Sequence, residues 1–232
     1  MPAAGRPAQS IPAVDVTPRA LTRDRILFAG LGVVEERGLD ALDLATVARA
    51  LHVLPRTLQR FMREEEIRSV VIDDIFGRLP TVSVGRNWRW RLESWARRMR
   101  RWLLEYPGLP GYLEAVHLER DETLGLLDAI VGLLQEAGVA DDELFYLASS
   151  FLCFVCQRVD GERQMGLQLG DGGPGSPSGD DAWTRLPSNL AEPVSAYASK
   201  DAETHFNTGI RVVLDGIGRQ GRRSRTRGSG GS

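Results

Sequence analysis

Residues 22 to 61 predict three short helices joined by tight connections. The first begins at Thr22, because a hydroxyl at this position caps free backbone amides, and Leu21 and Ile26 occupy the two positions of a hydrophobic staple. The run RDRILFAGLGVVEER continues to Gly38, which suits a helix end because glycine adopts a left-handed conformation without strain. This stretch therefore folds as helices rather than strands.

The second and third helices of this stretch are separated by only a few residues. Asp43 caps the second helix, LATVARAL, and Leu42 and Val47 supply another staple. Pro55 suits the first position of the third helix, because proline lacks an amide hydrogen that would be left unpaired there. Two helices joined this closely predict a helix-turn-helix, whose second helix enters the major groove of DNA.

The segment RILFAGLGVVEERGLDALDLATVARAL resembles the N-terminal domain of the TetR family of bacterial transcription regulators. Two later segments, EYPGLPGYLEAVHLERDETLGLLDAIVGLLQEAGV and FNTGIRVVLDGIGRQ, resemble the ligand-domain helices of that family more weakly. The resemblance implies an all-α homodimer that regulates transcription in response to a ligand. We expect a repressor that a small, mostly apolar effector releases from double-stranded DNA.

The chain divides into four parts on this interpretation. At 232 residues and 42% hydrophobic content it can form one small and one larger domain. The run GLQLGDGGPGSPSGDD has no apolar periodicity and predicts a mobile loop. The expected parts are a disordered tail at 1–20, a helix-turn-helix domain at 21–63, a helical ligand-binding and dimerisation domain at 64–219 with a mobile loop at 166–181, and a disordered basic tail at 220–232.

The distribution of charge agrees with a DNA-binding N-terminal domain. The whole chain carries a net charge of −2, but residues 1–63 hold nine Arg against six Asp and Glu, a local excess of three positive charges. A basic face is enough to attract phosphate. The first twenty residues lack the apolar stretch of a signal peptide, and no run reaches the length of a membrane span. We therefore expect a cytoplasmic protein with no membrane partner.

The third helix supplies most of the expected DNA contacts. Its N-terminal half faces base edges, so Arg56, Thr57, Gln59 and Arg60 are candidate base readers. Arg23 near the first helix and Thr46 in the second are expected to contact phosphates, and such contacts fix the register on DNA without reading its sequence. The full set of expected DNA-binding residues is Arg23, Thr46, Leu54, Pro55, Arg56, Thr57, Gln59, Arg60 and Arg63.

Several positions in the helix-turn-helix depart from the family pattern. His52 stands where the family usually has glycine in the turn, and Leu54 replaces the usual capping serine. Gln59 replaces the customary aromatic residue, and residues 64–66, all Glu, stand where a phosphate-binding Lys is expected. Three carboxylates near the DNA backbone would repel it. The operator is then read in an altered way, or the domain has lost DNA affinity.

The larger domain is predicted to hold the effector pocket and the dimer interface. Residues 87–106 carry an apolar stripe at helical spacing, Trp88, Leu92, Trp95, Met99, Trp102 and Tyr106. The expected ligand-binding residues, each also compatible with plain core packing, are Trp95, Met99, Trp102, Tyr112, His117, Leu127 and Phe151. By resemblance to the family, the helices predicted at 141–159 and 201–220 form the dimer interface through Phe151, Val155, Phe206, Ile210, Val213 and Ile217.

Other function classes fit the sequence less well. The segment ALHVLPRTLQRFMREE also resembles the first helix-turn-helix of AraC-type activators, but that family needs a second such motif, and residues 90–115 hold a helix rich in Trp and Arg instead. A TetR-like protein that binds ligand but no longer binds DNA is a further alternative. An enzyme is not expected, because the three His are scattered and no catalytic motif, cofactor loop or metal-ligand spacing is present.

Overall fold

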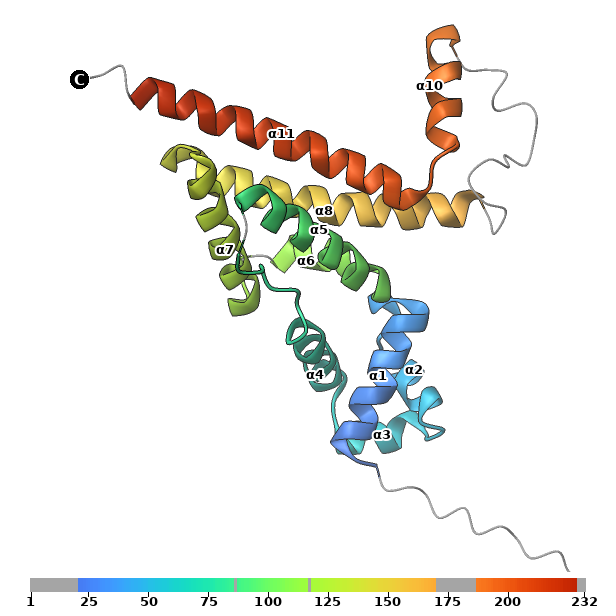
Figure 1. The fold of residues 1–232 in the computed structure, drawn as a ribbon. Coiled ribbons are helices and arrows are strands. Elements are labelled where there is room, and N and C mark those ends of the chain that lie inside the picture. The colour runs from blue at the N-terminus through green and yellow to red at the C-terminus, as the bar shows by residue number, and fades with distance from the viewer. Residues whose placement is uncertain (1–20, 86, 117, 170–186, 229–232) are drawn as a thin grey trace, which may run out of the picture.

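The computed structural model describes residues 21–85, 87–116, 118–169 and 187–228, and every regular element within these ranges is a helix (Figure 1). The all-α prediction is therefore confirmed. In chain order the elements are α1 (Arg23–Arg37), the short 3-10 helix η1 (Leu39–Ala41), α2 (Leu44–Ala50), α3 (Pro55–Phe61), α4 (Glu64–Phe76), α5 (Trp88–Glu105), α6 (Leu109–Val116), α7 (Asp121–Ala137), α8 (Asp141–Leu169), α10 (Ser188–Ala198) and α11 (Ala202–Gly228). The three helices predicted within residues 22–61 correspond to α1, α2 and α3, and the helix predicted at 87–106 corresponds to α5, whereas η1 was not predicted.

Two predicted helix caps are confirmed in the head, which consists of α1 to α4. The hydroxyl of Thr22 accepts a hydrogen bond from the Arg25 amide at 3.3 Å, and α1 begins there. The carboxylate of Asp43 accepts one from the Thr46 amide at 2.6 Å at the start of α2. This amide lowers the pKa of Asp43, because it stabilises the charged form of the carboxyl.

The head packs around a small apolar core to which each of its helices contributes. The contributing side chains are all at most 1% exposed, and they are Ile26, Val34, Val47, Leu58, Ile67 and Val71. Helix α1 approaches α4 very closely at Gly30, where an added β-carbon would lie 2.5 Å from Cγ2 of Val71. Gly30 therefore sets the spacing of these two helices, since any larger side chain would push them apart.

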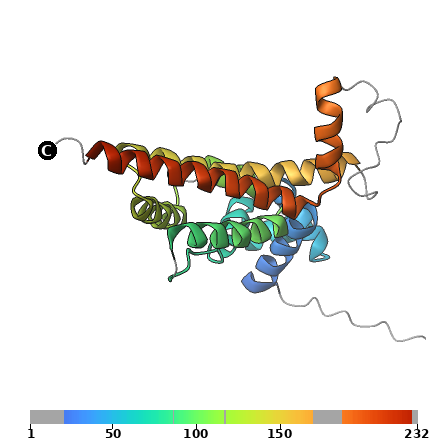
Figure 2. The same ribbon diagram turned by 45° about the horizontal axis from the view of Figure 1, so that its top comes forward.

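The body consists of α5 to α11, and its apolar core lies between α5, α7 and α8. The stripe predicted on α5 is buried as expected, except that Trp88 is only partly covered. Figures 1 and 2 both show α8 and α11 running alongside each other, while α10 stands away from them. Most of the described side chains of α10 are exposed, so this helix is not part of the core.

Polar groups join the head to the body on either side of α6 along the chain. On one side the Leu39 amide of the head donates a hydrogen bond to the Pro107 carbonyl at 2.8 Å. On the other side Arg120 donates to Asp73 of α4 at 2.7 Å, and its guanidinium lies 4.4 Å from the centre of the Phe76 ring. These contacts hold the head against the body through polar as well as apolar groups.

The predicted C-terminal tail is wrong over much of its length. Residues 220–232 were expected to be disordered, but α11 continues to Gly228. The extension lies against the end of α7, because a β-carbon at Gly221 would overlap the Ala137 carbonyl oxygen. Gln220 also donates a hydrogen bond to Glu143 of α8 at 2.5 Å. Only a glycine allows this approach, and the helix is held in place past the predicted end.

The predicted mobile loop at 166–181 is also wrong at its start, because residues 166–169 continue α8 as far as Leu169. A single helix can continue without burial when its backbone hydrogen bonds propagate from a well-packed segment. The remainder of that loop, the predicted tail at 1–20 and residues 229–232 lie outside the described residues.

The uncapped start of α3 leads to a stability prediction. Leu54 is the N-cap of α3, makes no side-chain hydrogen bond there and is 56% exposed. We expect Leu54→Ser to raise the free energy of unfolding by about 1 kcal/mol, because serine accepts from a free amide of the first turn. Thermal unfolding should then shift upward by roughly 2–4 °C for a domain of this size. Leu54→Ala is the matched control, since alanine removes leucine without adding a cap. Equal melting temperatures for the two variants would contradict the assignment.

Candidate nucleic-acid interface

Helix α3 is held to the head by one side chain and exposes nearly all the others. Leu58 is fully buried, and it fixes the rotation of this two-turn helix. The predicted DNA-binding residues of this segment are all exposed, and they are Leu54, Pro55, Arg56, Thr57, Gln59 and Arg60. A short helix anchored on one side presents its opposite side as a single ridge, which has the form needed to enter a DNA groove.

Arg56 and Arg60 lie one turn apart on the exposed side of α3. Residues at this spacing share a helix face. Within the part of the chain that the structure describes, neither guanidinium forms an ion pair. Both groups therefore keep their donors available for an external acceptor, such as a guanine edge or a phosphate.

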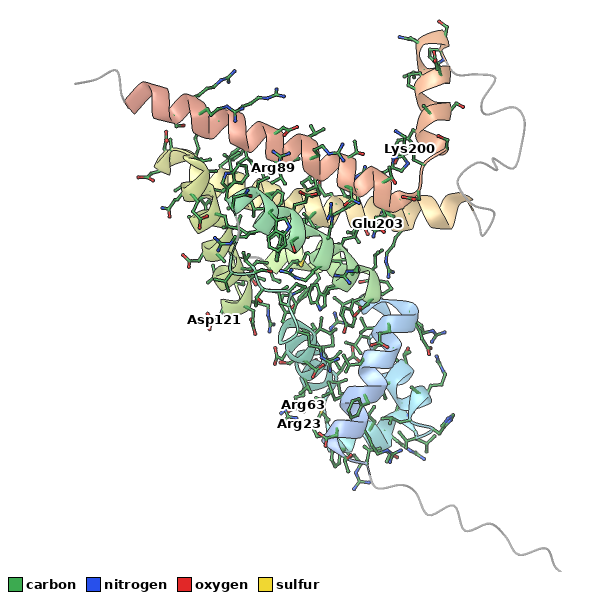
Figure 3. All side chains as sticks on the ribbon, in the orientation of Figure 1. Arg23, Arg63, Arg89, Asp121, Lys200 and Glu203 are labelled. Atoms are coloured by element: carbon green, nitrogen blue, oxygen red, sulfur yellow. The ribbon has the colours of Figure 1, made fainter. Side chains whose placement is uncertain are left out.

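Arg23 and Arg63 of the predicted DNA-binding set lie near α3, whereas Thr46, which was expected to contact phosphate, has another role. Arg23 and Arg63 are both exposed, and Figure 3 shows them at the end of the head that holds α3, away from α8 and α11. Thr46 is only partly exposed, and its amide donates to Asp43. Its side chain also hydrogen-bonds that carboxyl, which contributes to the lowered pKa of Asp43. Thr46 therefore serves the cap of α2 in this structure.

The acidic cluster at residues 64–66 is largely used inside the head. Glu64 accepts a hydrogen bond from the Leu44 amide at 3.1 Å, so it caps the start of α2 from a different helix. Glu66 accepts from the Arg63 amide at 2.8 Å and satisfies the start of its own helix α4. Glu65 is exposed and has no such role among the described residues. Two of the three carboxylates are therefore oriented by helix ends. Sequence spacing could not reveal the role of Glu64, because its partner Leu44 lies twenty residues away.

The altered turn before α3 retains the geometry that glycine would provide. His52 has a φ of 58°, in the left-handed region where a residue with a β-carbon is strained. The turn is closed by hydrogen bonds from the His52 and Val53 amides to the Arg49 and Ala48 carbonyls. The departure from the family pattern therefore changes the residue but keeps the path of the chain.

The residues predicted to bind a ligand mostly form packed core. Trp95, Met99, Leu127 and Phe151 are at most 3% exposed, and the rings of Trp95 and Phe151 are 5.8 Å apart. Trp102 and Tyr112 each contact the Phe76 ring edge-on, at 6.3 and 6.1 Å between ring centres. His117 lies outside the described residues. Apart from Trp102, these side chains line neither of the two cavities described next.

Two open cavities lie at the surface of the body. One, of about 500 Å³, is formed by the link between α4 and α5 together with the C-terminal half of α5, and its lining is Leu79, Pro80, Thr81, Ser83, Arg98, Arg101, Trp102 and Glu105. The other, of about 430 Å³, lies between α8, α10 and α11. The first shares only Trp102 with the predicted pocket. Sequence reasoning missed it because the arginines of α5 look like an ordinary solvated face.

The predicted dimer residues are mostly wrong. Five of them are at most 4% exposed within a single chain, so they face its own core and cannot reach a second copy; they are Phe151, Val155, Phe206, Ile210 and Ile217. Val213 is partly buried. The large apolar side chains that α8 and α11 leave exposed are instead Phe145, Tyr146 and Val212. The apolar stripe of α11 is buried as its spacing predicts, but it packs against the core of its own chain.

Other kinds of site are not supported by the described residues. Their His, Cys, Asp and Glu side chains form no group suited to holding a metal ion. Among the helices searched in the described ranges, none is both long and apolar enough to cross a membrane. The AraC-type alternative is contradicted, because residues 90–115 form parts of α5 and α6 rather than a second helix-turn-helix.

Comparisons with solved structures agree with this architecture. Apo ActR from Streptomyces coelicolor superposes with a TM-score of 0.62 at 22% identity, over 88% of this chain and 98% of that one. A possible TetR family transcriptional regulator from Streptomyces coelicolor A3(2) gives 0.64 at 24% identity, over 84% and 98%. TetR from Acinetobacter baumannii AYE gives 0.60 at 18% identity, over 86% and 98%. At these identities the likeness establishes the fold.

Comparison of the sequence with known families identifies the family of this chain. No curated protein matches the sequence of this chain. Residues 81–220 match the family described as tetracyclin repressor-like, C-terminal domain, and this range covers more than half of the chain. Together with the head that precedes it, this match shows that the chain belongs to the TetR family of transcriptional regulators.

Proposed function

We propose that this protein is a DNA-binding repressor that a small molecule releases from its operator. The observation that carries the proposal is the pair of exposed arginines, Arg56 and Arg60, on a helix whose rotation Leu58 fixes. An anchored cationic ridge of two turns suits the major groove, where Arg donates two hydrogen bonds to guanine. Arg23 and Arg63 would hold the flanking phosphates and set the register.

The arrangement of carboxylates supports retained DNA binding over its loss. Because Glu64 and Glu66 accept hydrogen bonds from helix N-termini, their charge interacts with the positive ends of α2 and α4. That leaves Glu65 as the carboxylate of the three without a hydrogen bond to a helix end among the described residues. A single opposing charge weakens association electrostatically, and the neighbouring Arg60 and Arg63 offset part of it.

A homodimer would present two copies of α3 to successive turns of a duplex. Two-fold symmetry then requires an operator made of two inverted half-sites. The exposed apolar residues Phe145 and Tyr146 of α8 and Val212 of α11 support an interface formed by these two helices. At Gly216 of α11 an added β-carbon would meet nothing within 4 Å, so this face offers a second helix a close approach.

The effector is proposed from the family and from the body of the protein. ActR has been solved in complex with actinorhodin, and a variant of the Acinetobacter TetR in complex with minocycline. By analogy, a small molecule with a large apolar part would bind the body here. Such a ligand lowers DNA affinity only by its preference for one arrangement of the heads, and about 1–3 kcal/mol of preference gives roughly 5- to 150-fold.

Replacing both arginines tests α3 as the recognition helix. Selection of bound sequences from random duplexes should yield an inverted repeat, and Arg56→Ala/Arg60→Ala should weaken binding to it by at least about 30-fold, since each bidentate contact contributes about 1–3 kcal/mol. Binding is measured by fluorescence anisotropy at several salt concentrations. The control is Arg97→Ala/Arg211→Ala, which removes two charges from the body. Equal losses in both double variants would mean that net charge alone explains the effect.

Reversing the charge at residue 65 tests the exposed carboxylate. Glu65→Lys should tighten DNA binding and steepen its salt dependence by about 0.9 in the logarithmic slope, because the new ammonium displaces one counterion from the duplex. Glu36→Lys makes the same change in charge near the far end of α1 and serves as control. If the two variants show the same slope as the unmodified protein, residue 65 does not lie against the DNA backbone.

Placing a charge at residue 212 tests the corrected dimer face. Val212 is 67% exposed in one chain, so Val212→Arg should leave the fold intact and convert a dimer to a monomer at micromolar concentration. A buried unpaired guanidinium at an interface is strongly unfavourable. Light scattering during size-exclusion chromatography measures the mass. Leu124→Arg on α7, where leucine is 43% exposed, is the control. A Val212→Arg protein that stays dimeric places the interface elsewhere.

A further inference from the structure

One wall of the cavity beside α5 is made by the link between α4 and α5. Three side chains of α5 donate hydrogen bonds to successive parts of this link. The Nε1 of Trp95 donates to the Pro80 carbonyl at 2.8 Å, Arg98 donates to the Thr81 carbonyl at 2.8 Å, and Arg91 donates to the Ser83 carbonyl at 2.9 Å. The wall is therefore fixed by the body rather than by chance contacts of a loop.

Hydrogen-bond donors dominate the side of the cavity that α5 provides. Arg98 bonds only neutral oxygens, those of Thr81 and Ser94, so its charge is not balanced by these partners. Arg101 is exposed and forms no ion pair within the described residues. Trp102 is 6% exposed, and its Nε1 is buried without a hydrogen-bond partner. Because this nitrogen has almost no accessible surface, it offers no donor to a molecule in the cavity, and the ring of Trp102 serves as part of the wall.

The charge and shape of the lining narrow the class of ligand. The guanidinium groups of Arg98 and Arg101 oppose the single carboxylate of Glu105, which leaves one net positive charge. Leu79 and Pro80 add apolar surface to the lining. The volume of about 500 Å³ falls within the range of small-molecule sites.

We propose that this cavity binds a small organic acid with one negative charge and an aromatic or branched apolar part. The acid group lies against Arg98 and Arg101, and the apolar part covers Leu79 and Pro80. The site differs from the packed interior between α5, α7 and α8, from which it takes only Trp102. The role of this acid as an effector rests on the proposed function. Its binding to the cavity does not depend on that function.

The position of the cavity gives such a ligand a route to the head. The link continues directly from α4, and Arg68 of α4 donates a hydrogen bond to the Leu42 carbonyl of the head at 2.8 Å. A ligand that binds one position of the link more tightly shifts α4 toward the matching arrangement. The head then moves with α4, because Gly30 leaves no space between α1 and α4.

Isothermal titration calorimetry with the full-length protein and 2-naphthoate tests the proposal directly. We expect 2-naphthoate to bind at least tenfold more tightly than 2-naphthamide, a neutral molecule of the same shape, because charge-assisted hydrogen bonds to guanidinium are lost in the amide. Arg101→Gln should weaken naphthoate about tenfold, and Glu105→Gln should tighten it severalfold. Arg97→Gln, one turn earlier on α5 and outside the cavity, is the matched control.

The outcomes separate this site from the proposed function. Equal affinity for acid and amide, naphthoate binding that Arg101→Gln leaves unchanged, or no binding at millimolar concentration would each overturn the site. Binding with the expected variant effects supports it, whether or not the protein binds DNA. Naphthoate that binds here but leaves the affinity for the selected operator unchanged would keep the site and exclude its role as an effector site. Failure to select any DNA sequence would count against the repressor proposal alone.

Discussion

Helix α4 belongs to both hydrophobic cores, and the arrangement of the molecule depends on this. At its N-terminal end Ile67 and Val71 pack against the other helices of the head, with Val71 directly against the space that Gly30 leaves. At its C-terminal end the ring of Phe76 meets Trp102 of the body edge-on. A rigid helix that fills both cores cannot shift at one end without moving the other. The position of the head is therefore set by packing in the body.

Local chemistry in the head could be read from the sequence where partners are close along the chain. The caps at Thr22 and Asp43 involve residues three positions away, and both were predicted. The use of Glu64 could not be predicted, because its partner, the Leu44 amide, becomes a neighbour only when α2 and α4 pack together. The backbone conformation of the turn before α3 could not be predicted from local sequence either. His52 was correctly noted as unusual, but the left-handed backbone that it adopts follows from the fold.

Apolar periodicity predicted which faces are buried in the body but not what covers them. The stripe of α11 that includes Phe206 and Ile210 is buried, and α5, α7 and α8 of the same chain supply its cover. A buried stripe and an interface stripe look the same in a sequence, since both require apolar side chains at helical spacing. What separates them is the number of neighbouring helices in the same chain. Val212 is exposed on the opposite side of α11. Apolar periodicity does not predict this side as an interface, because Val212 is a single apolar residue among polar ones there.

The arginines of α5 show how a solvated face and a binding face come to differ. Arg97 bonds Glu93 and Asn207, and Arg100 bonds Glu162 with two hydrogen bonds, so their charges are balanced or shared within the protein. Arg98 and Arg101 project on another side of the same helix, toward the link, where one carboxylate opposes two guanidinium groups. Arg98 and Arg101 therefore lie beside the link that joins α4 to α5. On the proposal made above, an anion bound there would act on the helix that both cores share, and the charge of the ligand would then matter as well as its size.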